Sequence, residues 1–198
     1  MEKIKPEERK YYEKIHKKMT APRSQDYYSK EIVLAEFRNG TKIENNLKKG
    51  SIILAMKKGK KIEKFNLKSL LPEFYKFNFD KDRWTHLPFC ELICGPIIES
   101  EKDLIIWMHE IGHAWDWLKN KEDYINDDRF YADTIAQQER NAWVWALKNM
   151  RLLIRQGFVG EDMTDKKMMD IAKSAMYNSA KTWPKEDASR CKFLNKEI

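Results

Sequence analysis

The chain has 198 residues, of which 42% are hydrophobic and 35% are charged. This length favours one domain with a sizeable core over two independent ones, and seven Trp, eight Tyr and nine Phe exclude a wholly disordered chain. With only seven Gly and six Pro, the composition also excludes a collagen-like or low-complexity chain.

Membrane and secretory signals are not evident in the sequence. The apolar run at residues 104–108, like every other in the chain, is far shorter than the roughly 20 residues that a membrane-spanning helix needs, and residues 1–8 contain no apolar core. The three cysteines are an odd number, and Cys90 and Cys94 lie about 13 Å apart in a predicted strand, too far for a disulfide. We therefore expect no structural disulfide and a reducing compartment, the cytoplasm.

The net charge of +7 raises the question of a polyanionic partner. Of the 38 cationic residues, 29 are Lys and nine are Arg, whereas proteins that recognise nucleic acids usually depend on the bidentate Arg side chain. The lysines are spread along the chain, with one denser lysine run at residues 57–61. This distribution favours a solvated basic surface over nucleic-acid binding through the lysine run.

The first half of the chain predicts one helix followed by strands. Residues 6–20 carry apolar side chains at helical spacing, and a connector with Pro and Ser follows. Residues 32–34 and 51–56 are apolar stretches separated by turn-forming residues, which is typical of strands. The lysine run then forms the turn of a hairpin. A third strand is expected over residues 87–98, where Pro88 predicts an edge position or a break.

The second half predicts three helices. They cover residues 104–119, 127–156 and 164–183. Ser100 and Asp103 form a capping pair before the first helix, Gly157 ends the second and Pro184 closes the third. The expected class is α+β, with a small mixed or antiparallel N-terminal sheet packed on a helical C-terminal half. The expected organisation is a single domain over residues 1–198, with a sheet-rich part (27–99), a helical part (100–183) and a tail (184–198).

The pattern H-E-x-x-H occurs at residues 109–113, inside the first predicted helix of the second half. His109 and His113 are four residues apart, so both imidazoles lie on one helix face, close enough to bind a single ion. The helix is apolar on all sides, which predicts that it is buried. Burying two imidazoles and the Glu110 carboxylate without partners is costly. A divalent cation would satisfy them; two core histidines hydrogen-bonded to backbone are the alternative.

Zinc in a catalytic site takes three protein ligands and leaves a fourth position for water. Glu139 is the best third ligand, because it falls on the apolar stripe of the second of these helices, where an unpaired carboxylate is unfavourable. Pairing of Glu139 with Arg140 or Arg151 is the alternative. His16 lies next to two lysines and is expected to face solvent, and His86 is a weaker candidate ligand.

These segments resemble the zincin metallopeptidases of the gluzincin kind. Residues 109–113, His-Glu-Ile-Gly-His, are similar to the helix that carries H-E-x-x-H in that group, and Glu139 is similar to its glutamate ligand on a following helix. Two motifs in this order, H-E-x-G-H-A and then E-x-x-A-x-x-aromatic-A, resemble those of the ImmA/IrrE type. The position of Asp116 just after His113 resembles the lethal-factor-like peptidases instead. The resemblance covers roughly residues 100–150 and implies one Zn²⁺ and a sheet before the active helix. Trp143 stands where many relatives have a polar residue.

The expected roles follow from the residue types and from this resemblance. Glu110 is the expected general base, which takes a proton from the water and passes it to the leaving amine. Tyr131, two helical turns before Glu139, is the first candidate donor to the oxyanion; a core tyrosine is the alternative. Asp116 and Asp133 are candidates to orient an imidazole N–H.

The function expected from the sequence is therefore a zinc-dependent metalloendopeptidase with a peptide or protein substrate. A catalytically silent zinc-binding regulatory module, in which Glu110 serves packing, is an alternative, and a basic nucleic-acid-binding protein is another. The strand near residues 90–98 is expected to offer an edge to an extended peptide. Cys90 and Cys94 are expected to be buried strand residues and not metal ligands.

Overall fold

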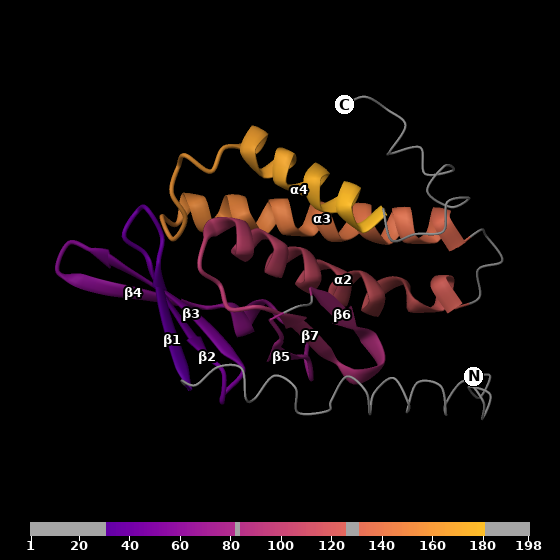
Figure 1. Cartoon of the computed structure of the whole chain (residues 1–198), viewed down its shortest axis with the longest axis horizontal. Coiled ribbons are helices and arrows are strands. Elements are labelled where there is room, and N and C mark those ends of the chain that lie inside the picture. Colours follow the sequence, from indigo (N-terminus) through magenta and orange to yellow (C-terminus); the bar gives the residue numbers. More distant parts are fainter. Residues whose placement is uncertain (1–30, 82–83, 126–130, 181–198) are drawn as a thin grey trace.

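The computed structural model describes residues 31–81, 84–125 and 131–180 of the chain. In chain order its elements are β1 (Ile32–Glu36), β2 (Lys42–Asn46), β3 (Ser51–Lys58), β4 (Lys61–Asn66), η1 (Leu67–Leu70), β5 (Lys76–Phe79), β6 (Thr85–Leu87), η2 (Pro88–Cys90), β7 (Leu92–Gly95), α2 (Glu101–Ile125), α3 (Tyr131–Arg155) and α4 (Asp165–Ala180). Two sheets precede three helices, so the predicted α+β class is confirmed (Figure 1). The predicted helix 6–20 and the tail 184–198 lie outside the described residues.

β1 to β4 form a four-stranded antiparallel sheet in sequence order. β1 and β3 are the two predicted strands, and the predicted hairpin turn lies at Gly59. The sequence did not predict β2, because Ile43 is its one apolar residue. The buried Asn45 side chain donates to the Ile98 carbonyl at 3.0 Å and accepts from the Ile98 N–H at 2.9 Å. These two bonds tie the sheet to the segment that leads into α2.

β7 is the central strand of a second sheet, parallel to β5 and antiparallel to β6. The prediction of one strand over residues 87–98 is wrong, because η2 separates β6 from β7. Pro88 opens η2, since it has no N–H to continue a ladder, and Glu91 redirects the chain with φ of 52°. The predicted break is therefore confirmed. Cys90 lies in η2 and not in a strand, whereas Cys94 is buried in β7, and both are free thiols.

The predicted start of the first helix and stop of the second are present, whereas Pro184, the predicted end of the third, lies outside the described residues. The Ser100 hydroxyl and N–H donate to the Asp103 carboxylate at 2.7 and 2.9 Å, and the Asp103 N–H donates back to the Ser100 hydroxyl. Gly157 follows α3 with φ of 82° and donates to the Ile154 carbonyl, which ends the helix as predicted. Within the described residues, no helix combines the length and apolar character that crossing a membrane requires.

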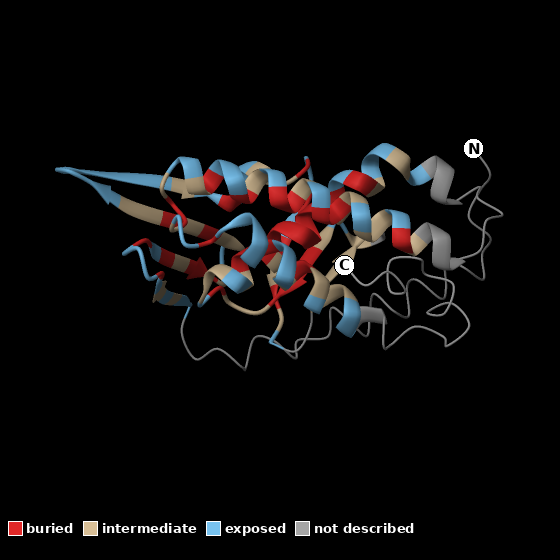
Figure 2. Ribbon diagram, turned by 90° about the horizontal axis from the view of Figure 1, so that it is seen from above, coloured by how far each residue is buried: buried red, intermediate tan, exposed pale blue. Residues whose placement is uncertain are grey.

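α2 lies between the second sheet and α3 (Figure 1). Trp107 is fully buried on the sheet side, where its ring meets Phe77 edge-on and its Nε1 donates to the Pro96 carbonyl at 2.9 Å. Buried residues gather where helices and strands meet (Figure 2). Trp115 and Leu118 are 42% and 44% exposed, so the prediction that this helix is buried on all sides is wrong for its later turns.

Gly112 sets the distance between α2 and α3. A Cβ at this position would lie 2.5 Å from the Ala142 carbonyl oxygen and 2.8 Å from the Ala142 Cα. Because these are backbone atoms of a packed helix, they cannot turn aside as a flexible side chain could, and only glycine allows the approach. Ala142 follows Glu139 by three residues, so this contact brings the Glu139 carboxylate beside the histidines of α2.

Candidate metal centre

His109 and His113 lie on consecutive turns of α2 and point to the same place. His109 is buried and His113 is largely buried. Their Nε2 atoms are 3.0 Å apart. Two imidazole lone pairs repel each other at that distance, so a proton or a cation is needed between them.

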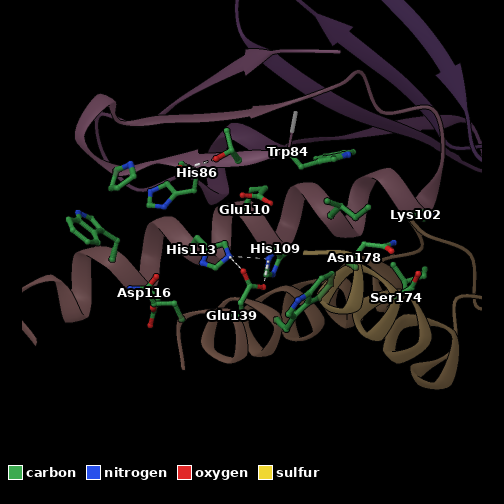
Figure 3. Close-up of a pocket in the computed structure, with 18 residues that line it drawn as sticks. Trp84, His86, Lys102, His109, Glu110, His113, Asp116, Glu139, Ser174 and Asn178 are labelled. Carbon is green, nitrogen blue, oxygen red and sulfur yellow. Dashed lines mark hydrogen bonds and ion pairs between the residues drawn. The ribbon is translucent and has the colours of Figure 1, made fainter. Parts of the chain in front are cut away.

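Glu139 reaches this place from α3. One carboxylate oxygen lies 3.2 Å from His109 Nε2, and the other lies 3.4 Å from His113 Nε2 (Figure 3). The Glu139 side chain is 14% exposed. Arg151, which was an alternative partner for Glu139, pairs instead with Asp165 at 2.8 Å. The fold therefore brings together the three residues that the sequence predicted as ligands.

The spacing of these atoms suits a small divalent cation. A tetrahedral zinc ion with ligands at about 2.0–2.1 Å has its ligand atoms about 3.3 Å apart. With one ligand atom taken from each residue, the three atoms all lie within 4.8 Å of one another; the two Nε2 atoms are 3.0 Å apart, and each is 3.2 or 3.4 Å from a different Glu139 oxygen. Two imidazoles and a carboxylate are also a donor set that zinc takes when it keeps a position for water. Among the described residues, His109, His113 and Glu139 form a group that could hold one metal ion.

Two of the three residues in the group have pKa shifts that suit a cation, whereas the raised pKa of His113 does not. Burial lowers the pKa of His109 to about 4, and the nearby His113 adds to this, against the opposing effect of Glu139. Burial alone would raise the pKa of Glu139, but the hydrogen bonds and charges of the two histidines lower it well below its ordinary value. At neutral pH His109 is thus neutral and Glu139 is ionised, as metal ligation requires.

Glu110 lies beside the group, on the side that faces β6. It is 7% exposed, and the backbone N–H of His86 donates to its carboxylate. Burial is the main reason that the pKa of Glu110 is raised to about 7. The charge of His113 and the hydrogen bond from His86 lower this pKa, and the charge of Glu139 raises it. A carboxyl group with a pKa near neutrality can both accept and release a proton at pH 7.

The two histidines have different neighbours on their outer sides. The His109 ring stacks on Trp143 with centroids 4.1 Å apart and an interplanar angle of 21°. Neither His109 Nδ1 nor Trp143 Nε1, both buried, has a hydrogen-bond partner among the described residues. Trp143 therefore packs over the face of the imidazole, and no described side chain orients the ring through a hydrogen bond to Nδ1.

On the other side, Asp116 is near His113. Asp116 is 8% exposed and accepts hydrogen bonds from Asn120 at 2.8 Å and from Asn141 at 2.6 Å. Burial lowers the pKa of His113, but the hydrogen bond and charge of Glu139, together with the charges of Glu110 and Asp116, raise it above the ordinary value. The proposed role of Asp116 in orienting an imidazole stays a prediction.

A cavity of about 810 Å³ opens over the metal-binding group (Figure 3). Four elements and their adjoining residues form its walls: β6, α2, α3 and α4. Besides the candidate ligands and Glu110, its lining includes Trp84, Thr85, His86, Pro88, Lys102, Ile106, Asp116, Trp117, Gln138, Trp143, Ile171, Ser174, Ala175 and Asn178. A molecule in this cavity can reach the ligand group and Glu110 together.

His86 lines this cavity but is not part of the ligand group. Its ring is parallel to that of His113, with centroids 6.3 Å apart, and its Nε2 lies 3.0 Å from the Tyr75 hydroxyl. Burial, with His113 adding to it, lowers the pKa of His86 to about 3. Three predicted residues are outside the described part of the chain: all of His16 and the side chains of Tyr131 and Asp133.

Sequence reasoning missed two parts of the site, Tyr75 and the wall that α4 contributes. Tyr75 lies before β5, where the sequence has no clear periodicity, so no local signal points to it. Ile171, Ala175 and Asn178 are spaced four and three residues apart, which indicates a shared helix face. That spacing does not say what the face meets.

Comparisons with known proteins do not assign a family. No protein-family model matches the chain, and neither the curated proteins nor the solved structures include a match. What stands is a buried His-His-Glu group on α2 and α3 that is consistent with an H-E-x-x-H site.

Proposed function

We propose that the protein is a zinc-dependent metallopeptidase. The observation that carries the proposal is the convergence of His109, His113 and Glu139 under an open cavity, with Glu110 buried beside them. A purely structural metal site would be closed by a fourth protein ligand, whereas this group opens toward the cavity.

The roles of the side chains follow from this arrangement. When bound, zinc would polarise a scissile carbonyl and lower the pKa of its water. Glu110 takes the proton of the attacking water and delivers it to the leaving amine, for which a pKa of about 7 is suitable. The N–H of His86 holds the Glu110 carboxylate in position between these two transfers.

The proposed substrate is a peptide or protein, and we propose a cytoplasmic location. β6 is an edge strand of its sheet, and Trp84, Thr85 and His86 line the cavity. An extended peptide can add to such an edge by backbone hydrogen bonds. The expectation that residues 90–98 offer this edge is wrong for β7, which is paired on both sides.

Metal analysis of the purified protein tests the ligand group. We expect one zinc per chain in the wild type and a large loss in His113→Ala and in Glu139→Ala. Glu99→Gln, at an exposed acid before α2, is the matched control and should keep its zinc. Unchanged zinc in both ligand variants would refute the metal site.

Cleavage profiling tests the reaction. Wild-type and Glu110→Gln proteins, each with measured zinc content, are incubated with a proteome-derived peptide library and the products are identified by mass spectrometry. We expect new termini with the wild type and none with Glu110→Gln, although the variant keeps its zinc. Equal cleavage by both proteins would remove Glu110 from the mechanism.

A catalytically silent zinc module is the second candidate function. The hydrogen bond from the His86 backbone to the buried Glu110 favours it, because the same bond could serve packing alone. In that case the wild type binds zinc and cleaves nothing, and Glu110→Gln changes the midpoint of thermal unfolding without any effect on turnover.

A further inference from the structure

The cavity contains a third imidazole whose position the proposed roles leave unused. His86 lies on the edge strand β6, and its ring faces that of His113 at an interplanar angle of 3°. Its own backbone N–H is bound to Glu110. The imidazole is therefore fixed next to the proposed base and opposite one of the candidate ligands.

Tyr75 is the hydrogen-bond partner of one nitrogen of this ring. Tyr75 is 4% exposed, its ring stacks on His86 with centroids 5.5 Å apart, and its hydroxyl is 3.0 Å from His86 Nε2. In the tautomer that carries its N–H at Nδ1, the Tyr75 hydroxyl donates in this bond. Nε2 then accepts, and a neutral imidazole has its N–H at Nδ1. No described residue accepts from His86 Nδ1.

Hydrolysis of a peptide bond needs a donor at the carbonyl oxygen, where negative charge develops. Glu110 is an acceptor in this step, and the nitrogens and oxygens of the ligand group face the cation. We propose that His86 donates its Nδ1–H to the carbonyl oxygen of the scissile bond, and that Tyr75 positions it as the donor tautomer. This inference rests on the proposed peptidase function and adds the residue that stabilises the oxyanion.

Kinetics of four zinc-loaded, full-length variants test the inference, with a peptide identified by the cleavage profiling as substrate. They are His86→Phe, His86→Asn, Tyr75→Phe and the double variant His86→Phe with Tyr75→Phe. Phe keeps a stacked ring without a donor, and the amide of Asn places an N–H near the position of Nδ1. Zinc content and the midpoint of thermal unfolding are measured for each variant.

We expect His86→Phe to lower kcat by about 100- to 1000-fold, with KM and zinc content unchanged, as loss of one oxyanion donor does. The kcat of His86→Asn should be at least tenfold higher than that of His86→Phe. Tyr75→Phe should lower kcat by about tenfold, and the double variant should be no slower than His86→Phe, because Tyr75 acts through His86. A merely structural role for Tyr75 would give additive losses.

If His86→Phe has the kcat of the wild type while Glu110→Gln is inactive, the inference is overturned. The proposed peptidase function then stands, but His86 has no part in it. Loss of zinc in His86→Phe would make His86 a ligand and also overturn the inference. If His86→Phe does not fold, His86→Asn decides: a drop in kcat to the level of the uncatalysed reaction refutes donation from this position. Cleavage by Glu110→Gln at the wild-type rate would instead refute the proposed function.

Discussion

His109 and His113 are one helical turn apart, yet their surroundings are opposite in character. His109 lies against the Trp143 ring, and its Nδ1 has no partner among the described residues. Glu139 contacts both histidines, but Glu110 and Asp116 raise the pKa of His113 in addition, and neither acts on His109. The apolar side therefore holds its imidazole by packing, and the charged side holds its imidazole by electrostatics.

This difference gives the two sides different tasks. Stacking fixes the plane of the His109 ring but adds nothing to its basicity, whereas carboxylates near a ligating imidazole raise its basicity. We therefore expect metal affinity to respond to the charges near His113, and the packing near His109 to tolerate a substitution that keeps an aromatic ring. The following predictions test this division.

The largest expected effect is that of a zinc ion, which the proposed ligands from both sides would bind together. Free zinc at about 1,000 times its Kd should raise the free energy of unfolding by about 4 kcal/mol, because it binds only the folded chain. Denaturant titration at buffered free zinc and in EDTA measures this difference. Glu139→Ala should abolish it, and an equal zinc effect in that variant would mean that the ion binds elsewhere.

Gly112→Ala is expected to have the next largest effect, because it moves α3, and with it Glu139, away from the two histidines of α2. The added methyl group would meet the Ala142 backbone at 2.5 Å, and such overpacking costs about 1–3 kcal/mol of stability. Alanine normally stabilises a helix relative to glycine, so the sign is diagnostic. Lys119→Ala, at an exposed position of α2, is the control. Zinc affinity should fall in Gly112→Ala and stay unchanged in Lys119→Ala. A Gly112→Ala protein more stable than the wild type would contradict the close contact.

The sequence was sufficient for those parts of the site that are local. Four residues along a helix place His109 and His113 on one face whatever the rest of the fold does. Glu139 required the further argument that a carboxylate on an apolar stripe needs a partner. The choice of that partner depends on the contact of Gly112 with Ala142, which no periodicity within one helix reveals.

The remaining parts depend on long-range pairing. β2 has one apolar residue, and its buried Asn45 finds its partner in the Ile98 backbone, 53 residues away. His86 meets Tyr75 only because β6 and β5 flank β7 in one sheet. Trp143 was recognised as unusual in sequence, but its stacking on His109 follows from how α3 packs on α2.

Asp116→Asn tests the charged side. Asn has the same size and keeps an acceptor for Asn120 and Asn141, so folding should change little, while the charge near His113 is lost. Loss of such a partner weakens metal binding by about 10- to 100-fold, which zinc titration against a competing chelator measures. Glu99→Gln, an acid removed from the site, should not change zinc affinity. An unchanged Kd in Asp116→Asn would show that Glu139 and Glu110 supply the electrostatic effect without Asp116.

Trp143→Phe tests the apolar side and has the smallest expected effect. The substitution keeps a ring against His109 and removes a buried N–H that has no described partner. Removing an unsatisfied buried donor returns about 1–3 kcal/mol, which offsets the lost packing, so the free energy of unfolding should change by less than about 1 kcal/mol. Trp107→Phe is the matched comparison, because it loses the same volume from α2 but also breaks the bond from Nε1 to the Pro96 carbonyl. Denaturant titration should therefore find Trp107→Phe about 2 kcal/mol less stable than Trp143→Phe. Equal losses in the free energy of unfolding would mean that the Trp143 N–H has a hydrogen-bond partner in solution and that water reaches the His109 side.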